Sequence, residues 1–236
     1  MRTAVVLQSN YIPWKGYFDL ISEADIFVFY DDVQYTSRDW RSRNKIKTAR
    51  GAEWISVPVG AHINRRICDT KINDIHWQMK HWRAIQHSYS KSRYFDIYRE
   101  LFESIYLGHT WNNLSELNQH CIKLISKDLL GLSTKFCHSS DYEVSGGKLD
   151  RLVEIVRKTG ATRYISGPAA KDYIDPLCFA EVGIELVWKD YSGYPEYPQR
   201  FQPFEHGVSI LDLLFNVGPN APWYIWGWRE GGSAPE

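Results

Sequence analysis

"VVLQSNYIPWKGYFDLI", residues 5–21, followed by "DIFVFYD", residues 25–31, decides the fold. The two apolar, β-branched runs predict buried strands over residues 3–8 and 25–31, and the segment between them predicts a short helix over 16–23. A strand, a short helix and a second buried strand favour a parallel pair. The polar loop after the first strand therefore lies where open α/β sheets bind their ligands.

The rest of the chain continues the alternation of strands and helices, with one interruption. Apolar and aromatic residues recur at helical spacing over about 75–131, which predicts a helical middle section inside an α/β fold. The fold class is a Rossmann-like, mainly parallel sheet in a single domain, 1–228, and the polar tail, 229–236, is expected to be disordered. Further strands are expected over 53–60, 134–141, 162–167 and 184–191, and further helices over 147–160 and 209–218.

Composition limits the function. Lys plus Arg and Asp plus Glu both number 28, so no net charge attracts the chain to nucleic acid. No charged leader and no run of eighteen apolar residues is visible, so we expect a cytoplasmic protein without membrane insertion. The four cysteines lack CxxC spacing, and no metal is expected. Aromatic residues make up 15% of the chain, which favours a ligand with flat or sugar-like faces.

Candidate site residues follow the predicted strands. Because the carboxyl ends of parallel strands meet at one edge of a sheet, loops from different strands are expected to converge on one crevice. The candidates are Gln8, Asn10, Tyr11 and Trp14 after the first strand, Asp31, Asp32 and Gln34 after the second, Arg41, Arg43, Asn44 and Lys47 in the basic segment 38–47, and Gly167, Lys171 and Tyr173 after the strand 162–167.

Several of these residues have a second interpretation. Asp31 and Asp32 are equally consistent with turn and helix-cap residues and with an amine or metal site. The basic segment 38–47 fits phosphate binding better than a solvated face, because guanidinium groups suit phosphate. Gly167 is either a turn residue or a point of close backbone approach, and an inward Lys171 would favour the second. Proximity along the chain of His206, Ser209 and Asp212 is a weak basis for a hydrolase triad.

Long motifs in order resemble the WbqC-like protein family almost end to end. They are "QSNYIPWKGYFDLISEADIFVFYDDVQYTSRDWRSRNKIKT", "WISVPV", "YISGPAAKDYI" and "SILDLLFNVG". Leu7 and Ser9 depart from the His and Pro that many members carry. The positions that match the family pattern are Gln8, Asn10, Tyr11, Pro13, Trp14, Gly16, Asp31, Asp32, Gln34, Arg43, Asn44, Ile46, Lys47, Gly167, Tyr173, Ser209 and Asp212.

The resemblance implies an activity on a nucleotide-linked amino sugar in O-antigen or other surface-polysaccharide synthesis. The implied reaction is a transfer of an acyl or aminoacyl group, such as glycyl, to the sugar amine. The acyl donor and cofactor are unknown; a carrier thioester, and hence a carrier protein as partner, is one candidate. A noncatalytic nucleotide-sugar binding protein and an ATP-using ligase are the alternatives.

The transferase hypothesis gives the candidate residues definite roles. Asp31 or Asp32 would orient and deprotonate the amine, and Asn10 or Gln8 would stabilise the oxyanion. Arg43 and Lys47 would hold the diphosphate, while Tyr11 and Trp14 would offer stacking faces. The loop Pro13–Tyr17 is also similar to the Pro-His-x-Gly-His loop of nucleotidyltransferases, with aromatic residues replacing both histidines.

Overall fold

A five-stranded parallel sheet forms the centre of the computed structural model, which describes residues 1–231 and 233. The strand order is β5-β2-β1-β6-β7. This confirms the predicted Rossmann-like α/β class. The strands are β1 (Thr3–Leu7), β2 (Ile26–Phe29), β5 (Lys135–His138), β6 (Arg163–Ser166) and β7 (Glu185–Trp188).

Alternate residues of the inner strands face two separate cores. Val5 pairs with Phe27 across the parallel β1–β2 ladder, and both belong to the larger core. Ala4 and Val6 belong to the smaller core on the opposite face. Because successive side chains of a strand point to opposite faces, a strand covered on both sides reads as a continuous apolar run.

Strand order reverses between β1 and β6. From β1 the chain moves outward to β2 and β5, and then returns to the other side of β1 to form β6 and β7. Ligands of open α/β sheets bind at such a reversal, beyond the carboxyl ends of the strands. The loops that follow β1 and β6 therefore flank the expected crevice.

Helices cover both faces of the sheet. The helical middle section, predicted over 75–131, consists of α2 (Trp77–Tyr89), α3 (Phe95–Leu107), α4 (Leu114–Leu124) and a π-helical turn (Ile125–Leu129). It joins the larger core, whereas α5 and α6 join the smaller one. The other helices are α1 (Lys15–Ser22), α5 (Lys148–Lys158), α6 (Leu177–Ala180), α7 (Ile210–Val217) and α8 (Ala221–Ile225), with short 3-10 turns over Ile67–Asp69, Ser139–Tyr142, Pro168–Asp172, Gly218–Asn220 and Gly227–Glu230.

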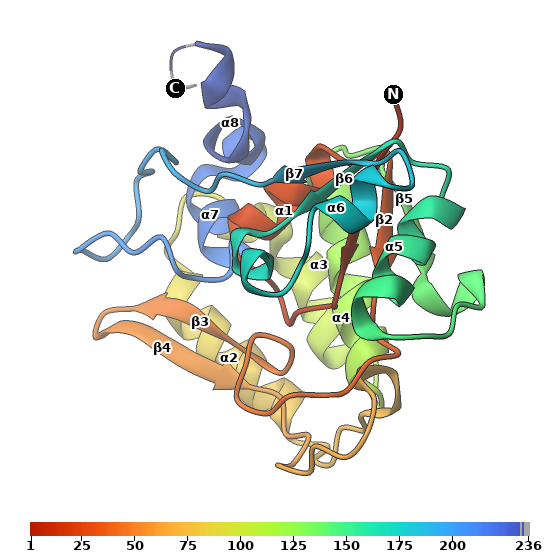
Figure 1. Ribbon diagram of the computed structural model, residues 1–236. Coiled ribbons are helices and arrows are strands. Elements are labelled where there is room, and N and C mark those ends of the chain that lie inside the picture. The colour runs from red at the N-terminus through yellow and green to blue at the C-terminus, as the bar shows by residue number, and fades with distance from the viewer. Residues whose placement is uncertain (232, 234–236) are drawn as a thin grey trace.

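The strand expected over 53–60 does not enter the central sheet. Residues of this segment form β4 (Gly51–Ser56), which pairs antiparallel with β3 (Arg43–Thr48) in a separate hairpin. In Figure 1 this hairpin lies apart from β2, β5, β6 and β7, at the lower left. Only two residues connect β3 to β4, and so short a connection permits an antiparallel pair but no parallel crossover.

The C-terminal part of the chain packs back on α1. Residues 189–209, here called the strap, have no regular secondary structure and lead into α7. The predicted disordered tail begins too early, because Arg229 lies in the turn Gly227–Glu230 and forms an ion pair with Asp19. Residues 232 and 234–236 of that tail lie outside the described residues.

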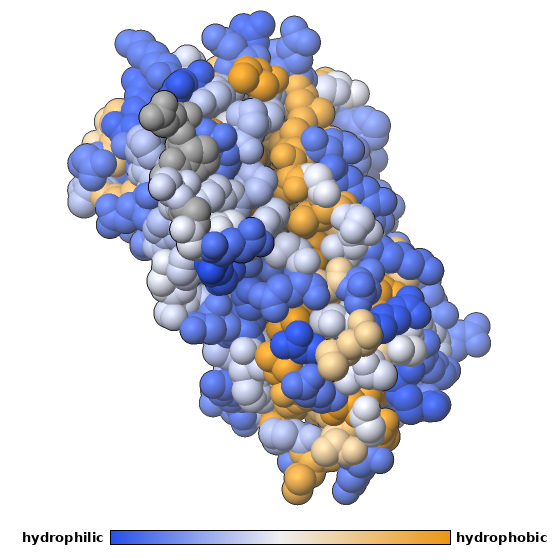
Figure 2. Space-filling model, turned by 90° about the horizontal axis from the view of Figure 1, so that it is seen from above, coloured by the Kyte–Doolittle hydropathy of each residue, from blue (hydrophilic) through white to orange (hydrophobic). Residues whose placement is uncertain are grey.

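The surface is mostly polar on the face that Figure 2 shows, with a band of hydrophobic side chains between hydrophilic areas. In the described part of the chain, no helix combines the length and the apolar character needed to span a membrane.

Candidate functional site

A cavity of about 340 Å³ lies beside the loop that joins β1 to α1. Three separate segments build it: this loop, the stretch from Trp40 into β3, and the end of the strap. Its volume is in the range of small-molecule sites. The lining residues are Asn10, Pro13, Trp14, Trp40, Asn44 and Gly207.

The hairpin holds the β1–α1 loop in a defined conformation. The side-chain amide of Asn44 donates to the carbonyl oxygens of Tyr11 (3.0 Å) and Ile12 (2.8 Å), and the Tyr11 N–H donates to the Trp40 carbonyl (2.9 Å). Ile12 has a φ of 34°, which is strained for a β-branched residue. The buried Asn44 therefore shapes the cavity wall instead of offering its donors to a ligand.

Trp14 forms the aromatic wall of the cavity and is half-buried, as predicted for a pocket residue. Its ring meets Tyr191 and Tyr194 of the strap edge-on, with centroids 5.3 and 5.9 Å apart. A Cβ atom on Gly16 would lie 2.3 Å from the Trp14 ring. Gly16 thus makes room for this ring.

Tyr11 is not a stacking face of the cavity. It is fully buried, and its hydroxyl is hydrogen-bonded to Tyr106 (2.6 Å) and to Nδ1 of His81 (2.8 Å). Burial raises its pKa well above the usual value, and burial also lowers the pKa of His81 to about 4. This neutral polar cluster fixes the loop to the helical section. Gln8 is not among the residues that line this cavity, and its carbonyl oxygen accepts a hydrogen bond from the Tyr17 hydroxyl at 3.0 Å.

Asp31 is an internal anchor. It is buried and accepts bonds from the Ser9 N–H (2.8 Å), the Gln119 amide (2.8 Å) and the Ser115 hydroxyl. Since Ser115 and Gln119 belong to α4, the carboxylate ties the loop after β1 to this helix. Both carboxylate oxygens of Asp31 accept these internal hydrogen bonds. The expectation that Asp31 faces a substrate amine as a base is therefore wrong.

Asp32 is also engaged. It forms an ion pair with Arg151 of α5 and accepts the hydroxyl of Ser139. Neither Asp31 nor Asp32 is among the residues that line the cavity. The two carboxylates connect the end of β2 to the helices on its two sides, but neither of them caps a helix, so the helix-cap interpretation is also wrong.

The basic segment divides into buried and surface groups. Lys47 is buried and donates to the Pro203 carbonyl of the strap, so it is not placed to hold a diphosphate. Arg41 pairs with Asp39 at 2.5 Å, and Arg43 lies over the Trp54 ring. The buried Nε of Arg41 and the buried Nε of Arg43 have no hydrogen-bond partner. Arg43 also donates to the Arg38 carbonyl, and the two arginines are not among the residues that line the cavity, although both lie on the segment between the lining residues Trp40 and Asn44.

The loop after β6 reaches the cavity wall indirectly. Gly167 lies against Tyr191, whose hydroxyl would be 3.8 Å from a Cβ at this glycine, and Tyr191 packs on Trp14. Tyr173 is 71% exposed. Partial desolvation raises the pKa of Tyr173, and the positive charge of Arg41 opposes that rise.

Two further candidates lie away from the cavity. Lys171 is exposed with its amine 5.8 Å from the Trp188 ring centroid, so it does not point inward. Gln34 borders a shallow polar depression together with Asn64, Arg65, Arg66 and Asp69. The structure therefore brings Asn10, Trp14 and Asn44 together around the cavity, places Arg41 and Arg43 on the adjoining segment, and leaves Gln34 and Lys171 elsewhere.

Two groups that are adjacent in sequence to cavity residues come close together in the fold. The sequence pointed to His206 only through the hydrolase triad, and it did not single out Lys15. The Lys15 amine is enclosed by Tyr194 and Tyr197, 5.0 and 5.2 Å from their ring centroids, and donates to the Pro195 carbonyl. Burial lowers its pKa to about 8. His206 directly precedes the cavity residue Gly207, and desolvation together with the Lys15 charge lowers its pKa, so its imidazole is neutral at pH 7. Only the tertiary arrangement shows that these two residues are neighbours.

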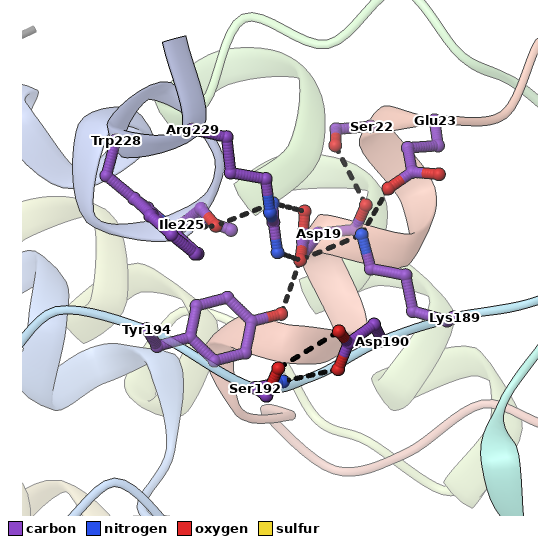
Figure 3. Close-up of polar contacts among 10 residues, drawn as sticks. All are labelled: Asp19, Ser22, Glu23, Lys189, Asp190, Ser192, Tyr194, Ile225, Trp228 and Arg229. Carbon is purple, nitrogen blue, oxygen red and sulfur yellow. Dashed lines mark hydrogen bonds and ion pairs between the residues drawn. The ribbon is translucent and has the colours of Figure 1, made fainter. Parts of the chain in front are cut away.

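An ion-pair network joins α1, the strap and the C-terminal turn (Figure 3). Asp19 is fully buried and accepts two bonds from Arg229 (2.9 and 2.8 Å) and one from the Tyr194 hydroxyl. The Lys189 amine lies 2.9 Å from the same carboxylate and also pairs with Glu23. The network fixes Tyr194, one of the rings that support Trp14.

No cluster of three or more His, Cys, Asp or Glu side chains suited to a metal ion occurs within residues 1–231. The site is instead built from amide, aromatic and guanidinium groups.

Fold and cavity together define an α/β protein with a Rossmann-like parallel sheet and a small-molecule cavity beside the first strand-to-helix loop. The chain belongs to the WbqC-like protein family, which it matches over residues 8–224. It is 46% identical over 227 residues, 95% of this chain and 98% of the relative, to the uncharacterized protein Rv1507c of Mycobacterium tuberculosis (strain ATCC 25618 / H37Rv). No solved structure matches the chain significantly.

Proposed function

We propose that this protein transfers an acyl or aminoacyl group, such as glycyl, to the amine of a nucleotide-linked amino sugar used for surface-glycan synthesis. The observation that carries the proposal is the composition of the cavity. Trp14 offers an aromatic wall, Asn10 offers an amide, and the guanidinium groups of Arg41 and Arg43 lie on the adjoining segment. Aromatic and amide groups suit a sugar, and guanidinium groups suit a diphosphate.

His206 is the base in this proposal. Its imidazole is neutral at pH 7, and the following residue lines the cavity. The sugar amine attacks the carbonyl carbon of an acyl thioester to form the C–N bond, and its proton passes to His206. The tetrahedral intermediate then collapses with cleavage of the C–S bond, and the protonated His206 returns the proton to the departing thiolate, which leaves as the thiol. The Asn10 amide donates to the oxygen that becomes negatively charged in the tetrahedral intermediate.

A noncatalytic nucleotide-sugar binding protein is the second candidate. It is favoured by one observation: the two carboxylates at the end of β2 are engaged in internal contacts. A catalytic site built on them would need both sets of contacts to break.

Following product mass separates these functions. The purified protein is incubated with a nucleotide-linked amino sugar and an acyl or glycyl thioester, and in parallel with the free acid plus ATP. A transferase gives the acylated sugar from the thioester without ATP. Saturable binding without any product would support the binding protein and contradict the transferase. A product that forms only with ATP would identify a ligase.

Replacing Arg43 with Ala should weaken binding of the nucleotide-linked sugar by about 1–3 kcal/mol, because a charge-assisted bond to phosphate is lost. Arg50→Ala is the matched control, since Arg50 lies on the same hairpin, is highly exposed and pairs with Glu53. Calorimetric titration of both variants measures the difference. Equal affinities of the Arg43 variant and the wild type would remove Arg43 from the site.

A further inference from the structure

Two tryptophans are exposed side by side at the mouth of the cavity. Trp40, from the segment before β3, and Trp54, from β4, are 45% and 43% exposed. Their ring centroids are 5.2 Å apart with an angle of 39° between the planes. We call this pair the aromatic platform. Large apolar side chains grouped on a surface are typical of ligand contacts.

Cationic groups accompany the aromatic platform. The Arg43 guanidinium carbon lies 4.1 Å from the Trp54 ring centroid, and the Lys45 amine lies 5.3 Å from it. Lys45 is also the cross-strand partner of Trp54 in the hairpin. The buried Nε of Arg43 has no partner. Flat apolar rings and positive charges therefore share one face of the hairpin.

The aromatic platform is continuous with the cavity, because Trp40 also lines the cavity with Trp14 and Asn10. A ligand that lies on the platform could extend past Trp40 into the cavity. The separation of 5.2 Å between Trp40 and Trp54 is too small for a third ring between them. A bound ring would lie on the exposed side of the platform.

We propose that the aromatic platform binds the base of a nucleoside diphosphate, that Arg43 and Lys45 contact its diphosphate, and that the attached sugar enters the cavity. This assignment rests on the proposed function and specifies how the substrate lies in the site. Bases stack on aromatic side chains, whereas a neutral saccharide would make no use of the two cations. The platform thus recognises the carrier nucleotide, and the cavity recognises the sugar.

The test compares Trp54→Ala, Trp54→Phe and the wild type, with Ile97→Ala as an exposed control on α3. Trp54 is chosen because it does not line the cavity. The probes are UDP, GDP, pyrophosphate and glucosamine, each followed by calorimetry. Loss of base stacking should weaken UDP or GDP about 5- to 100-fold in Trp54→Ala. Pyrophosphate should bind all four proteins equally, and Trp54→Phe should recover most of the nucleotide affinity.

Each other result contradicts a definite part of the account. Unchanged nucleotide affinity in Trp54→Ala would overturn the platform and leave the proposed transferase intact. If Trp54→Ala lost as much affinity for pyrophosphate as for the nucleotides, Trp54 would act only through Arg43. If it lost affinity for glucosamine alone, the platform would be a sugar site. Both results would overturn the assignment. A wild-type protein that binds neither UDP nor GDP would overturn nucleotide recognition as a whole. Nucleotide binding that depends on Trp54, without acylated product in the mass assay, would support the platform and contradict the transferase.

Discussion

Replacing Asp19 with Asn should lower the free energy of unfolding by about 3–5 kcal/mol. The Asn side chain keeps the shape but removes the charge that Lys189 and Arg229 share. Lys189 is almost fully buried and would keep only the partly exposed Glu23 as a counter-charge, and removing the buried partner of a buried cation is strongly destabilising. Urea denaturation followed by circular dichroism measures the change.

Glu100→Gln is the matched control for Asp19→Asn, because Glu100 is an exposed acid on α3. Its effect should stay within about 0.5 kcal/mol, as for most surface substitutions. If Asp19→Asn were as stable as this control, the network in Figure 3 would contribute nothing measurable and could not be what fixes Tyr194.

Replacing His206 with Ala should reduce turnover of the proposed acyl transfer by about 10²- to 10⁴-fold, the usual contribution of a general base. Binding of the nucleotide-linked sugar should be retained, since this prediction assigns His206 to proton transfer alone. His76→Ala, at an exposed position before α2, is the control. Single-turnover rates and calorimetric affinities on the same samples separate the two effects.

The pH dependence gives an independent check on His206. Desolvation and the Lys15 charge lower its pKa from the usual 6.5, so the neutral base is present at pH 7. Turnover should fall as the pH drops through the lowered pKa, where the imidazole gains a proton and can no longer accept one from the amine. If the same acidic limb persisted in the residual activity of His206→Ala, another group would have to be the base.

The strands of the central sheet could be predicted from the sequence because a strand that is buried on both faces consists of consecutive apolar residues. The runs in β1 and β2 are apolar without interruption, and their residues alternate between two cores. Helical periodicity was equally sufficient for α5, whose apolar positions share one face. Local patterns decide such elements, and the prediction therefore needed no tertiary information.

The hairpin shows where local patterns fail. The segment 53–60 has the composition of an inner strand, yet the two-residue connection after Thr48 pairs it with β3. Which strand a segment pairs with depends on the length of the connecting loop and on which elements cover the two faces of the sheet. The sequence also suggested Tyr11 and Asp31 as ligand contacts, because buried polar networks use the same residue types as binding sites. Only the positions of Tyr106 and Gln119, far along the chain, distinguish the two cases.

Arg229 is a similar case at the end of the chain. Arg229 is the first residue of the polar tail 229–236, and the composition of this tail predicted disorder from residue 229 onward. The buried carboxylate of Asp19, 210 residues earlier, holds it in place. Long-range ion pairs leave no periodic signal in a sequence.

The central claim is that the cavity beside the β1–α1 loop binds a nucleotide-linked amino sugar, and calorimetric titration of wild type and Trp14→Ala with this ligand tests it most directly. Trp14 is half-buried, so Trp14→Ala should unfold cooperatively and lose less than the about 3–5 kcal/mol expected for a large aromatic in a core. It should lose most of its affinity for the ligand. A folded Trp14→Ala protein that binds the nucleotide-linked amino sugar as tightly as the wild type would contradict the account.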